Sequence, residues 1–253
     1  MMPPEPRPLG PGDVHWWSTR LELAPHVIAS LQATLNQEER ERADRFAFPH
    51  LRRRYVVARG LLRQWLAGYL ELAPADVRFA YEAHGKPVLE AGNPADLRFN
   101  VSHTGDLAVF ALTKSHSIGV DVEALRAMPD ALALADRFFS PSERQALHAV
   151  GAADRDVAFF SCWTRKEAYV KATGEGLTCD LESFDVSVAP GEPARLLRLF
   201  GSSAAAARWA VEALDVPAGF IAAVAVATSE IRVRNVGTAG EPFEPSGLAR
   251  RTA

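Results

Sequence analysis

The stretch that decides the fold is residues 99–123, FNVSHTGDLAVFALTKSHSIGVDVE. Its apolar runs, separated by turn residues, predict short β-strands. Side chains two apart in a strand share a face, so Asp121 and Glu123 should project together while Val120 and Val122 face the core. Two adjacent carboxylates repel unless a cation or a shared proton lies between them, and Mg²⁺ prefers such oxygen ligands. The alternative interpretation is a solvated polar face on an edge strand.

A second spacing lies in the helix predicted for residues 154–173. Trp163, Glu167 and Lys171 follow one another at four-residue steps and therefore share one helix face. In isolation, Glu167 followed by Lys171 is an ordinary helix-stabilising ion pair. Lys166 beside them and the glycine-rich TGEGL directly after them favour a functional interpretation.

These two patterns predict one site if the helix packs against the strand. Glu167 would then meet Asp121 and Glu123, and three carboxylates would converge on one point. Lys171 and His103 would supply positive or proton-donating groups around a polyphosphate, which is the arrangement that phosphoryl transfer needs.

Composition limits the class of protein. The 253 residues allow one large domain or two of ordinary size, and 48% are hydrophobic, as in a globular protein. A net charge of −3 argues against a broad nucleic-acid-binding surface. Two cysteines, Cys162 and Cys179, are too few for a disulfide framework and indicate a reducing compartment. With no signal peptide and no apolar run long enough to span a bilayer, we expect a soluble, cytoplasmic protein without membrane contact.

The order of elements predicts an α+β fold. Each half contains a long amphipathic helix followed by several short strands of antiparallel type, which indicates two similar α/β lobes. We expect a disordered N-terminal segment over 1–13, an N-terminal lobe over 14–125, a C-terminal lobe over 126–236 and a disordered tail over 237–253. A ligand site is expected in the cleft between the lobes.

Two capping boxes and an arginine-rich helix complete the pattern. Asn36 with Glu39, and Ser140 with Glu143, each predict a helix start. The charges after Asn36 predict a surface helix. The helix over 50–72 carries several arginines that either form a solvated face or grip a phosphate: Arg52, Arg53, Arg54, Arg59 and Arg63.

Several ordered motifs give the chain a family resemblance. FNVSHTGDLAVFAL, IGVDVE, FFSPSERQAL and WTRKEAYVKATGEGL, with HGKPVL upstream, resemble the 4'-phosphopantetheinyl transferases of the single-chain surfactin-synthetase-activating (Sfp) type. The resemblance covers residues 40 to 190. It implies two α/β lobes with antiparallel sheets, related by pseudo-twofold symmetry.

The resemblance also implies an activity. Such enzymes transfer the 4'-phosphopantetheine arm of coenzyme A to a serine of an apo acyl or peptidyl carrier protein, with Mg²⁺, and release adenosine 3',5'-bisphosphate. Because one chain supplies both lobes and hence the cleft, we expect a monomer. Two alternatives stay open: a catalytically silent module that binds carrier proteins, and a different Mg²⁺-dependent nucleotide enzyme.

By the same resemblance, Asp121, Glu123 and Glu167 would hold Mg²⁺. Glu167, directly or through a water, would also be the base for the carrier serine, with Lys171 on the pyrophosphate. Ser102 and His103 match nucleotide-phosphate contacts, and Lys86 of HGKP matches a lysine near the same group. Basic residues placed against coenzyme A by rough alignment are Arg45, Arg53 and Arg54.

Overall fold

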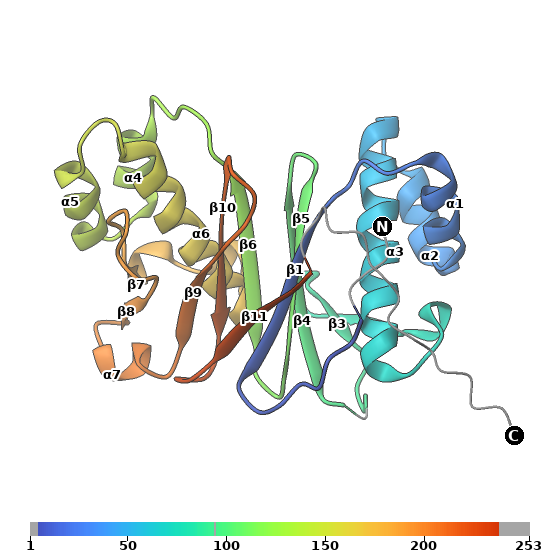
Figure 1. Cartoon of the computed structure of the whole chain (residues 1–253). Helices are drawn as coiled ribbons and strands as arrows, with labels where there is room; N and C mark the ends of the chain where they lie inside the picture. The colour runs from blue at the N-terminus through green and yellow to red at the C-terminus, as the bar shows by residue number, and fades with distance from the viewer. Residues whose placement is uncertain (1–4, 94, 238–253) are drawn as a thin grey trace, which may run out of the picture.

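Figure 1 shows the computed structural model of the chain, which describes residues 5–93 and 95–237. Two groups of helices lie on the outside, and two main β-sheets lie between them. This mixed α+β architecture of two lobes, with several antiparallel sheets, confirms the predicted fold class. No helix within these two ranges is long and apolar enough to cross a membrane.

The N-terminal lobe is built on a four-stranded sheet. Its strands, in spatial order, are β11 (Arg232–Gly237), β1 (Asp13–Arg20), β5 (Leu107–Lys114) and β4 (Leu97–Thr104). The long helix α3 (Pro49–Leu70) packs on this sheet through Trp65, which meets Trp17 and Phe110 edge-on. Burial of these rings fixes the helix to the sheet. The other elements of this half are α1 (Pro25–Ala33), α2 (Gln37–Asp44), β2 (Phe79–Tyr81) and β3 (Pro87–Leu89).

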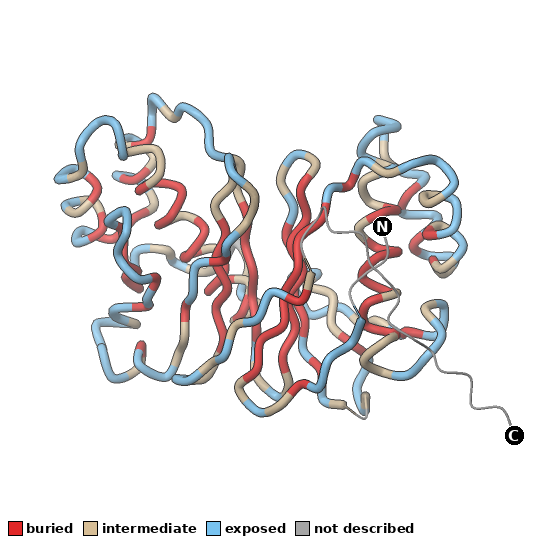
Figure 2. Tube along the Cα trace, viewed as in Figure 1, coloured by how far each residue is buried: buried red, intermediate tan, exposed pale blue. Residues whose placement is uncertain are grey.

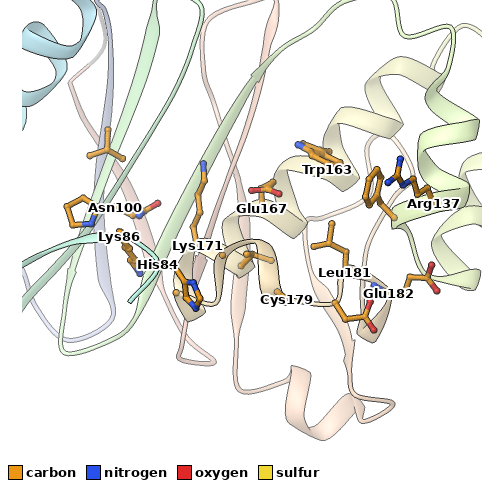
Figure 3. A pocket seen from close by; sticks show the side chains of 18 residues that line it. His84, Lys86, Asn100, Arg137, Trp163, Glu167, Lys171, Cys179, Leu181 and Glu182 are labelled. Carbon is orange, nitrogen blue, oxygen red and sulfur yellow. Dashed lines mark hydrogen bonds between the residues drawn. The ribbon is translucent and has the colours of Figure 1, made fainter. Parts of the chain in front are cut away.

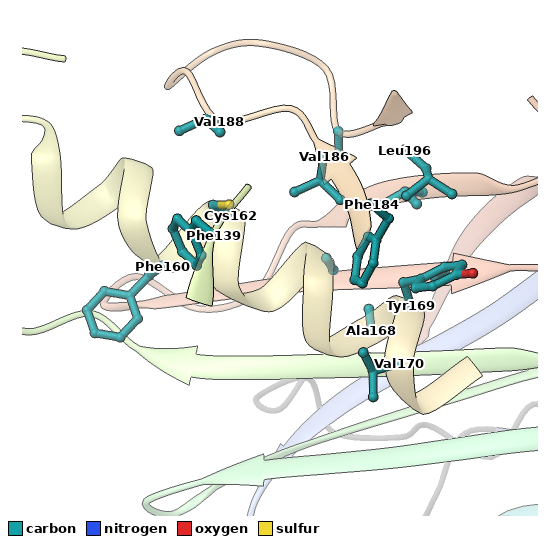
Figure 4. Packing of buried hydrophobic residues seen from close by; sticks show 14 of the residues in the cluster. Phe139, Phe160, Cys162, Ala168, Tyr169, Val170, Phe184, Val186, Val188 and Leu196 are labelled. Atoms are coloured by element: carbon teal, nitrogen blue, oxygen red, sulfur yellow. The ribbon is translucent and has the colours of Figure 1, made fainter. Parts of the chain in front are cut away.

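The C-terminal lobe repeats this plan with a three-stranded sheet. Its strands are β6 (Ile118–Ala124), β10 (Phe220–Val226) and β9 (Ala210–Leu214), in that order. The helix α6 (Arg155–Thr173) packs on this sheet, and Figure 4 shows the apolar side chains around it, among them Tyr169 and Phe184. The other elements are α4 (Ala131–Phe138), α5 (Pro141–Ala149), β7 (Phe184–Val186), β8 (Leu196–Leu199) and α7 (Ser203–Ala206).

A third apolar cluster lies between the two sheets. It contains Trp16 of β1, Val120 and Val122 of β6, and Val224 of β10, all 3% exposed or less. Figure 2 shows this buried zone at the centre of the molecule. The positions of Val120 and Val122 confirm the predicted alternation along β6, and leave Asp121 and Glu123 on the face toward α6.

Strand pairing departs from the predicted lobe boundaries in two places. β6 falls within 14–125 but pairs antiparallel with β10. β11 falls within 126–236, except for Gly237 of the expected tail, but pairs with β1. The β1–β11 pair is parallel, so the first sheet is not wholly antiparallel as expected. An alternating pattern specifies the faces of a strand but not its neighbour, which is why the sequence misplaced both strands. Each lobe therefore contains one strand from the other half of the chain.

The N-terminal segment is more ordered than expected over its described part. Leu9 is only 8% exposed and belongs to the core under α3, and Pro6 lies against Gly68. The prediction of disorder for 1–13 is therefore wrong at Leu9, because its side chain gains apolar burial. Residues 1–4, and the part of the expected tail over 238–253, lie outside the described residues.

Two of the arginines expected either on a solvated face or on a phosphate are buried against a carboxylate. Arg59 and Arg63 are 8% and 1% exposed, and their Nε atoms donate to the two carboxylate oxygens of Glu39 at 2.6 and 2.7 Å. Glu39 also closes the predicted capping box with Asn36. The helix α2 therefore places the buried carboxylate of Glu39 against α3. The many charged residues of α2 predicted an exposed helix and gave no sign of this contact.

Candidate active site

The site begins at a close contact between β6 and α6. A Cβ added to Gly119 would lie 2.1 Å from the carbonyl oxygen of Ala168, so no side chain fits between strand and helix at this point. This close approach brings the last turns of α6 within reach of the carboxylates on β6. Asp121 is 4% exposed, whereas the Glu123 side chain is 25% exposed and has Arg126 at 3.7 Å.

Lys171 connects the helix to both central strands. Its Nζ atom donates to Asp121 Oδ1 at 2.6 Å and to Ser102 Oγ at 2.9 Å. Ser102 in turn donates to the same Asp121 oxygen at 2.9 Å. Residues from β4, β6 and α6 thus form one hydrogen-bonded group.

The charge of Asp121 affects the pKa values of Glu123 and Glu167, but these three carboxylates do not form a compact cluster. Burial raises the pKa of Glu167, and the charges of Asp121 and Glu123 raise it further; Lys171 opposes them. Burial and the charge of Asp121 likewise raise the pKa of Glu123. Among the residues that the structure describes, no group of three or more His, Cys, Asp or Glu side chains is close enough to hold a metal ion. The expected convergence is therefore incomplete.

The donor set nevertheless fits a hard cation. The second carboxylate oxygen of Asp121, Oδ2, is buried and has no hydrogen-bond partner. A buried carboxylate oxygen without a partner is energetically costly. Burial and the repulsion between carboxylates together raise the pKa values of the two glutamates. A cation placed between Asp121 and these glutamates would satisfy the Asp121 oxygen and relieve the repulsion.

A cavity of about 650 Å³ opens beside this group, between the lobes. Figure 3 shows that side chains from the turn between β2 and β3 lie at one end, and that Trp163 and Arg137 lie at the other, with Glu167 and Lys171 between them. The two ends differ in chemistry. At the first end are His84, Lys86 and Asn100; at the second are Arg137, Phe138, Trp163, Leu181 and Glu182. An elongated ligand with a polar and a less polar half would fit this cavity.

Of the other residues predicted to bind coenzyme A, some line the cavity and others do not. Lys86 lines the cavity, whereas His103 is exposed at the strand position next to the buried Ser102. Arg54 donates to Glu22 at 3.1 Å, and Arg45 and Arg53 are exposed. None of these three arginines is among the described residues that line the cavity.

Sequence reasoning missed two groups of residues near the site. Asn100 is buried, lines the cavity and accepts the backbone N–H of Val120 at 2.9 Å, which ties β4 to β6. Its position two residues before Ser102, on the same strand face, was a usable signal. Phe138 and Leu181 gave no such signal, because apolar residues near a helix end are typical of any core.

Comparison with known proteins places the chain in a family. Residues 19–115 match the N-terminal family of 4'-phosphopantetheinyl transferases, and residues 117–225 match the 4'-phosphopantetheinyl transferase superfamily. The chain is 40% identical over 216 residues to the 4'-phosphopantetheinyl transferase HetI of a Nostoc species, covering 85% of this chain and 88% of that protein. The chain therefore belongs to the 4'-phosphopantetheinyl transferase family and is an enzyme of that class.

The chain is also similar to a second 4'-phosphopantetheinyl transferase and, more weakly, to one solved structure. The 4'-phosphopantetheinyl transferase Sfp of Bacillus subtilis is 32% identical over 152 residues, which cover 60% of this chain and 66% of that protein. A solved structure, the holo-[acyl-carrier-protein] synthase of Thermotoga maritima, aligns with a TM-score of 0.34 and 22% identity over 46% of this chain and 64% of that chain.

Proposed function

We propose that this enzyme transfers the 4'-phosphopantetheine arm of coenzyme A to a serine of an apo acyl or peptidyl carrier protein, with Mg²⁺, releasing adenosine 3',5'-bisphosphate. One observation carries the proposal: Glu167 and Lys171 line a cavity between the lobes, and Lys171 contacts an Asp121 that has an unpartnered buried oxygen. Carboxylates that need a cation, beside an ammonium group in an elongated cavity, fit a pyrophosphate ligand.

The proposed step is a displacement at phosphorus. The serine oxygen of the carrier bonds to the phosphorus that bears the pantetheine, and the bond from that phosphorus to the bridging oxygen breaks. The bridging oxygen leaves with adenosine 3',5'-bisphosphate. Glu167, directly or through a water, accepts the serine proton.

Asp121, Glu123 and Glu167 would hold the Mg²⁺. When bound, the ion supplies positive charge to the pyrophosphate oxygens and the leaving group. Lys171 adds a second positive charge from its place on α6, and Ser102 orients that ammonium group through the bond at 2.9 Å. Protein groups therefore position the two substrates, and positioning provides a large part of the rate.

Other residues are proposed to bind the donor. Ser102 and His103 would contact the nucleotide phosphates, and Arg45, Arg53 and Arg54 would lie along coenzyme A. We propose that the enzyme works as a monomer, since the cavity forms within one chain. The free thiols of Cys162 and Cys179 fit a reducing compartment such as the cytoplasm.

Intact mass spectrometry of an apo carrier protein tests this function. The protein, coenzyme A and carrier are incubated with Mg²⁺ or with a chelator. We expect the carrier to gain one phosphopantetheine arm only with Mg²⁺, while adenosine 3',5'-bisphosphate accumulates in equal amount. No gain with several unrelated carriers would contradict the proposal.

A matched pair of variants tests the role of Glu167. Glu167→Gln should lower the transfer rate by about 10²-fold or more, since it removes both a base and a cation ligand. Its melting temperature should stay level or rise, because repulsion among carboxylates is relieved. Glu212→Gln, on the exposed face of β9, is the control and should transfer at the wild-type rate. An active Glu167→Gln variant would exclude the assigned role.

A further inference from the structure

The turn between β2 and β3 carries Lys86 from the N-terminal lobe to the end of α6. The Nζ atom of Lys86 donates to the carbonyl oxygen of Ile118 at 3.1 Å and to that of Ala172 at 3.4 Å. The first acceptor begins β6, and the second lies in the last turn of α6. Lys86 therefore binds both elements that carry the carboxylates and Lys171.

The carbonyl of Ala172 needs such a donor. The last four carbonyls of a helix have no partner within the helix, and α6 ends where Gly174 adopts a left-handed conformation, with φ of 78°. Gly174 N–H bonds to Val170, which leaves Ala172 to other donors. A cation is favoured at this place, because the helix dipole is negative at its C-terminus.

A second residue of the hairpin turn lies close to the same turn of the helix. A Cβ on Gly174 would lie 2.6 Å from a carboxylate oxygen of Glu82, at the start of the same hairpin turn as Lys86. On the other side, Gly119 lets β6 touch the backbone of Ala168 and Ala172. The last turn of α6 is thus enclosed by β6 and by the hairpin turn of the opposite lobe. Lys171, which reaches Asp121, is part of this turn.

We propose that Lys86 is a positioning residue that joins the lobes and holds the last turn of α6, so that Lys171 stays aligned with Asp121 and Ser102. This inference rests on the proposed function for its catalytic consequence. It differs from the role suggested by resemblance, in which Lys86 binds a nucleotide phosphate. The ammonium group has two backbone acceptors, and burial lowers its pKa while Glu82 opposes that effect.

The two roles predict different donor dependence. Lys86→Met is compared with wild type using coenzyme A and dephospho-coenzyme A, which lacks the 3'-phosphate. For a positioning residue, we expect kcat to fall by about 10- to 100-fold with both donors, by the same factor, while KM for each donor stays level. Lys86→Arg should recover part of the loss, since it keeps a cationic donor. A loss confined to coenzyme A, a raised KM with both donors at unchanged kcat, or no loss with either donor would overturn the inference.

Hydrogen exchange provides a test that does not depend on transfer. Lys86→Met should speed exchange at the amide of Gly174, which caps α6, and lower the melting temperature by about 2–8 °C. Lys114→Met, at the end of β5, is the control and should change neither. Unchanged exchange at Gly174 would overturn the positioning role even if the enzyme transfers the arm. Absence of transfer by the wild type, with faster exchange in the variant, would instead count against the proposed function alone.

Discussion

Each lobe buries one glutamate of a capping box against its long helix. In the N-terminal lobe, Glu39 caps α2 and pairs with Arg59 and Arg63 of α3. In the C-terminal lobe, Glu143 caps α5 and pairs with Lys166 of α6 at 2.8 Å. In each lobe, the carboxylate of this glutamate has two roles: it accepts a hydrogen bond at a helix N-terminus, and it pairs with a buried cation.

The two pairs differ in their electrostatic balance. Burial opposes the ionised form in both lobes. The hydrogen bond from Arg63 and the charges of both arginines outweigh burial at Glu39, and its pKa lies below the usual value. Burial dominates at Glu143, where one ammonium group and two backbone N–H groups do not offset it, and its pKa is raised. The capping-box glutamate of each lobe is therefore buried in both cases, although its ionised form is strongly stabilised at Glu39 and weakly stabilised at Glu143.

The buried cation of each ion pair also binds the backbone of a segment at or next to the cavity. Arg63 Nη1 donates to the carbonyls of Pro74 and Val77 at 2.8 and 3.0 Å, directly before β2 and the turn that carries Lys86. Lys166 donates to the carbonyls of Leu181 and Phe184 at 2.7 and 2.8 Å, in the segment that lines the opposite end. Buried charge in each lobe therefore fixes one half of the proposed site.

Removal of the N-terminal carboxylate should have the largest effect. Glu39→Gln leaves two buried guanidinium groups without their counter-charge, and we expect a loss of about 3–5 kcal/mol in the free energy of unfolding. Urea denaturation measures this loss. Glu38→Gln, on the exposed side of the same helix turn, is the control and should change stability by less than about 0.5 kcal/mol. Equal losses in the two variants would remove the basis of the comparison.

A methyl group at the strand–helix contact should be the next most damaging change. Gly119→Ala forces β6 away from α6, and we expect a loss of about 3 kcal/mol together with loss of transfer, because Lys171 moves from Asp121. Gly60→Ala is the matched change in the N-terminal lobe. It crowds Leu31 of α1, where a Cβ would lie 2.7 Å from Leu31 Cβ.

The Gly60→Ala variant should lose less stability and keep its transfer rate. Its overpacking is partly offset by about 1 kcal/mol of helix propensity, and the α1–α3 contact contains none of the proposed site residues. Denaturation and transfer assays on both variants make the comparison. Full activity in Gly119→Ala would show that the close contact is not needed for the site.

Removal of the C-terminal carboxylate should cost less than removal of Glu39. Glu143→Gln leaves Lys166 with its two carbonyl acceptors, and burial already disfavours the ionised glutamate, so we expect a loss of about 1–3 kcal/mol. Because the folded-state pKa of Glu143 is raised, its ionisation removes stability as the pH rises from the ordinary glutamate value through the folded value. Urea denaturation between pH 4 and pH 8 should therefore show a smaller deficit for the variant at the upper end. A loss as large as that of Glu39→Gln would contradict the assigned difference.

A buried histidine gives the N-terminal lobe a further pH dependence. His15 is fully buried, its Nδ1 lies 2.7 Å from Tyr69 Oη, and burial lowers its pKa. Asp13 opposes that shift, and Arg234 and Arg7 add to it. The unfolded chain therefore takes up a proton first as the pH falls below about 6.5, and stability declines by up to about 1.4 kcal/mol per pH unit.

Comparison of His15→Gln with wild type isolates this contribution. The variant should lose less stability than the wild type between pH 7.5 and pH 5.5 in urea denaturation. The exposed His148, changed to Gln, is the control and should follow the wild type. Identical pH slopes for wild type and His15→Gln would exclude His15 as the cause.

The sequence predicted local features well and tertiary partners less well. Period-two alternation correctly placed Asp121 opposite Val120, and the capping boxes at Asn36 and Ser140 are both present. Side-chain composition could not show that Arg63 and Lys166 are buried, because a charged residue is buried only when another element supplies its partner. The partners of β6 and β11, and the hydrogen bonds of Lys86, likewise depend on contacts between distant parts of the chain.

The central claim is that both lobes form one site for coenzyme A. Hydrogen exchange of the full chain, with and without coenzyme A and Mg²⁺, tests it most directly. We predict slower exchange in the β2–β3 hairpin of the N-terminal lobe and in residues 174–182 of the C-terminal lobe, since both segments contribute residues to the cavity lining. Protection confined to one lobe, or protection remote from both segments, would contradict the claim.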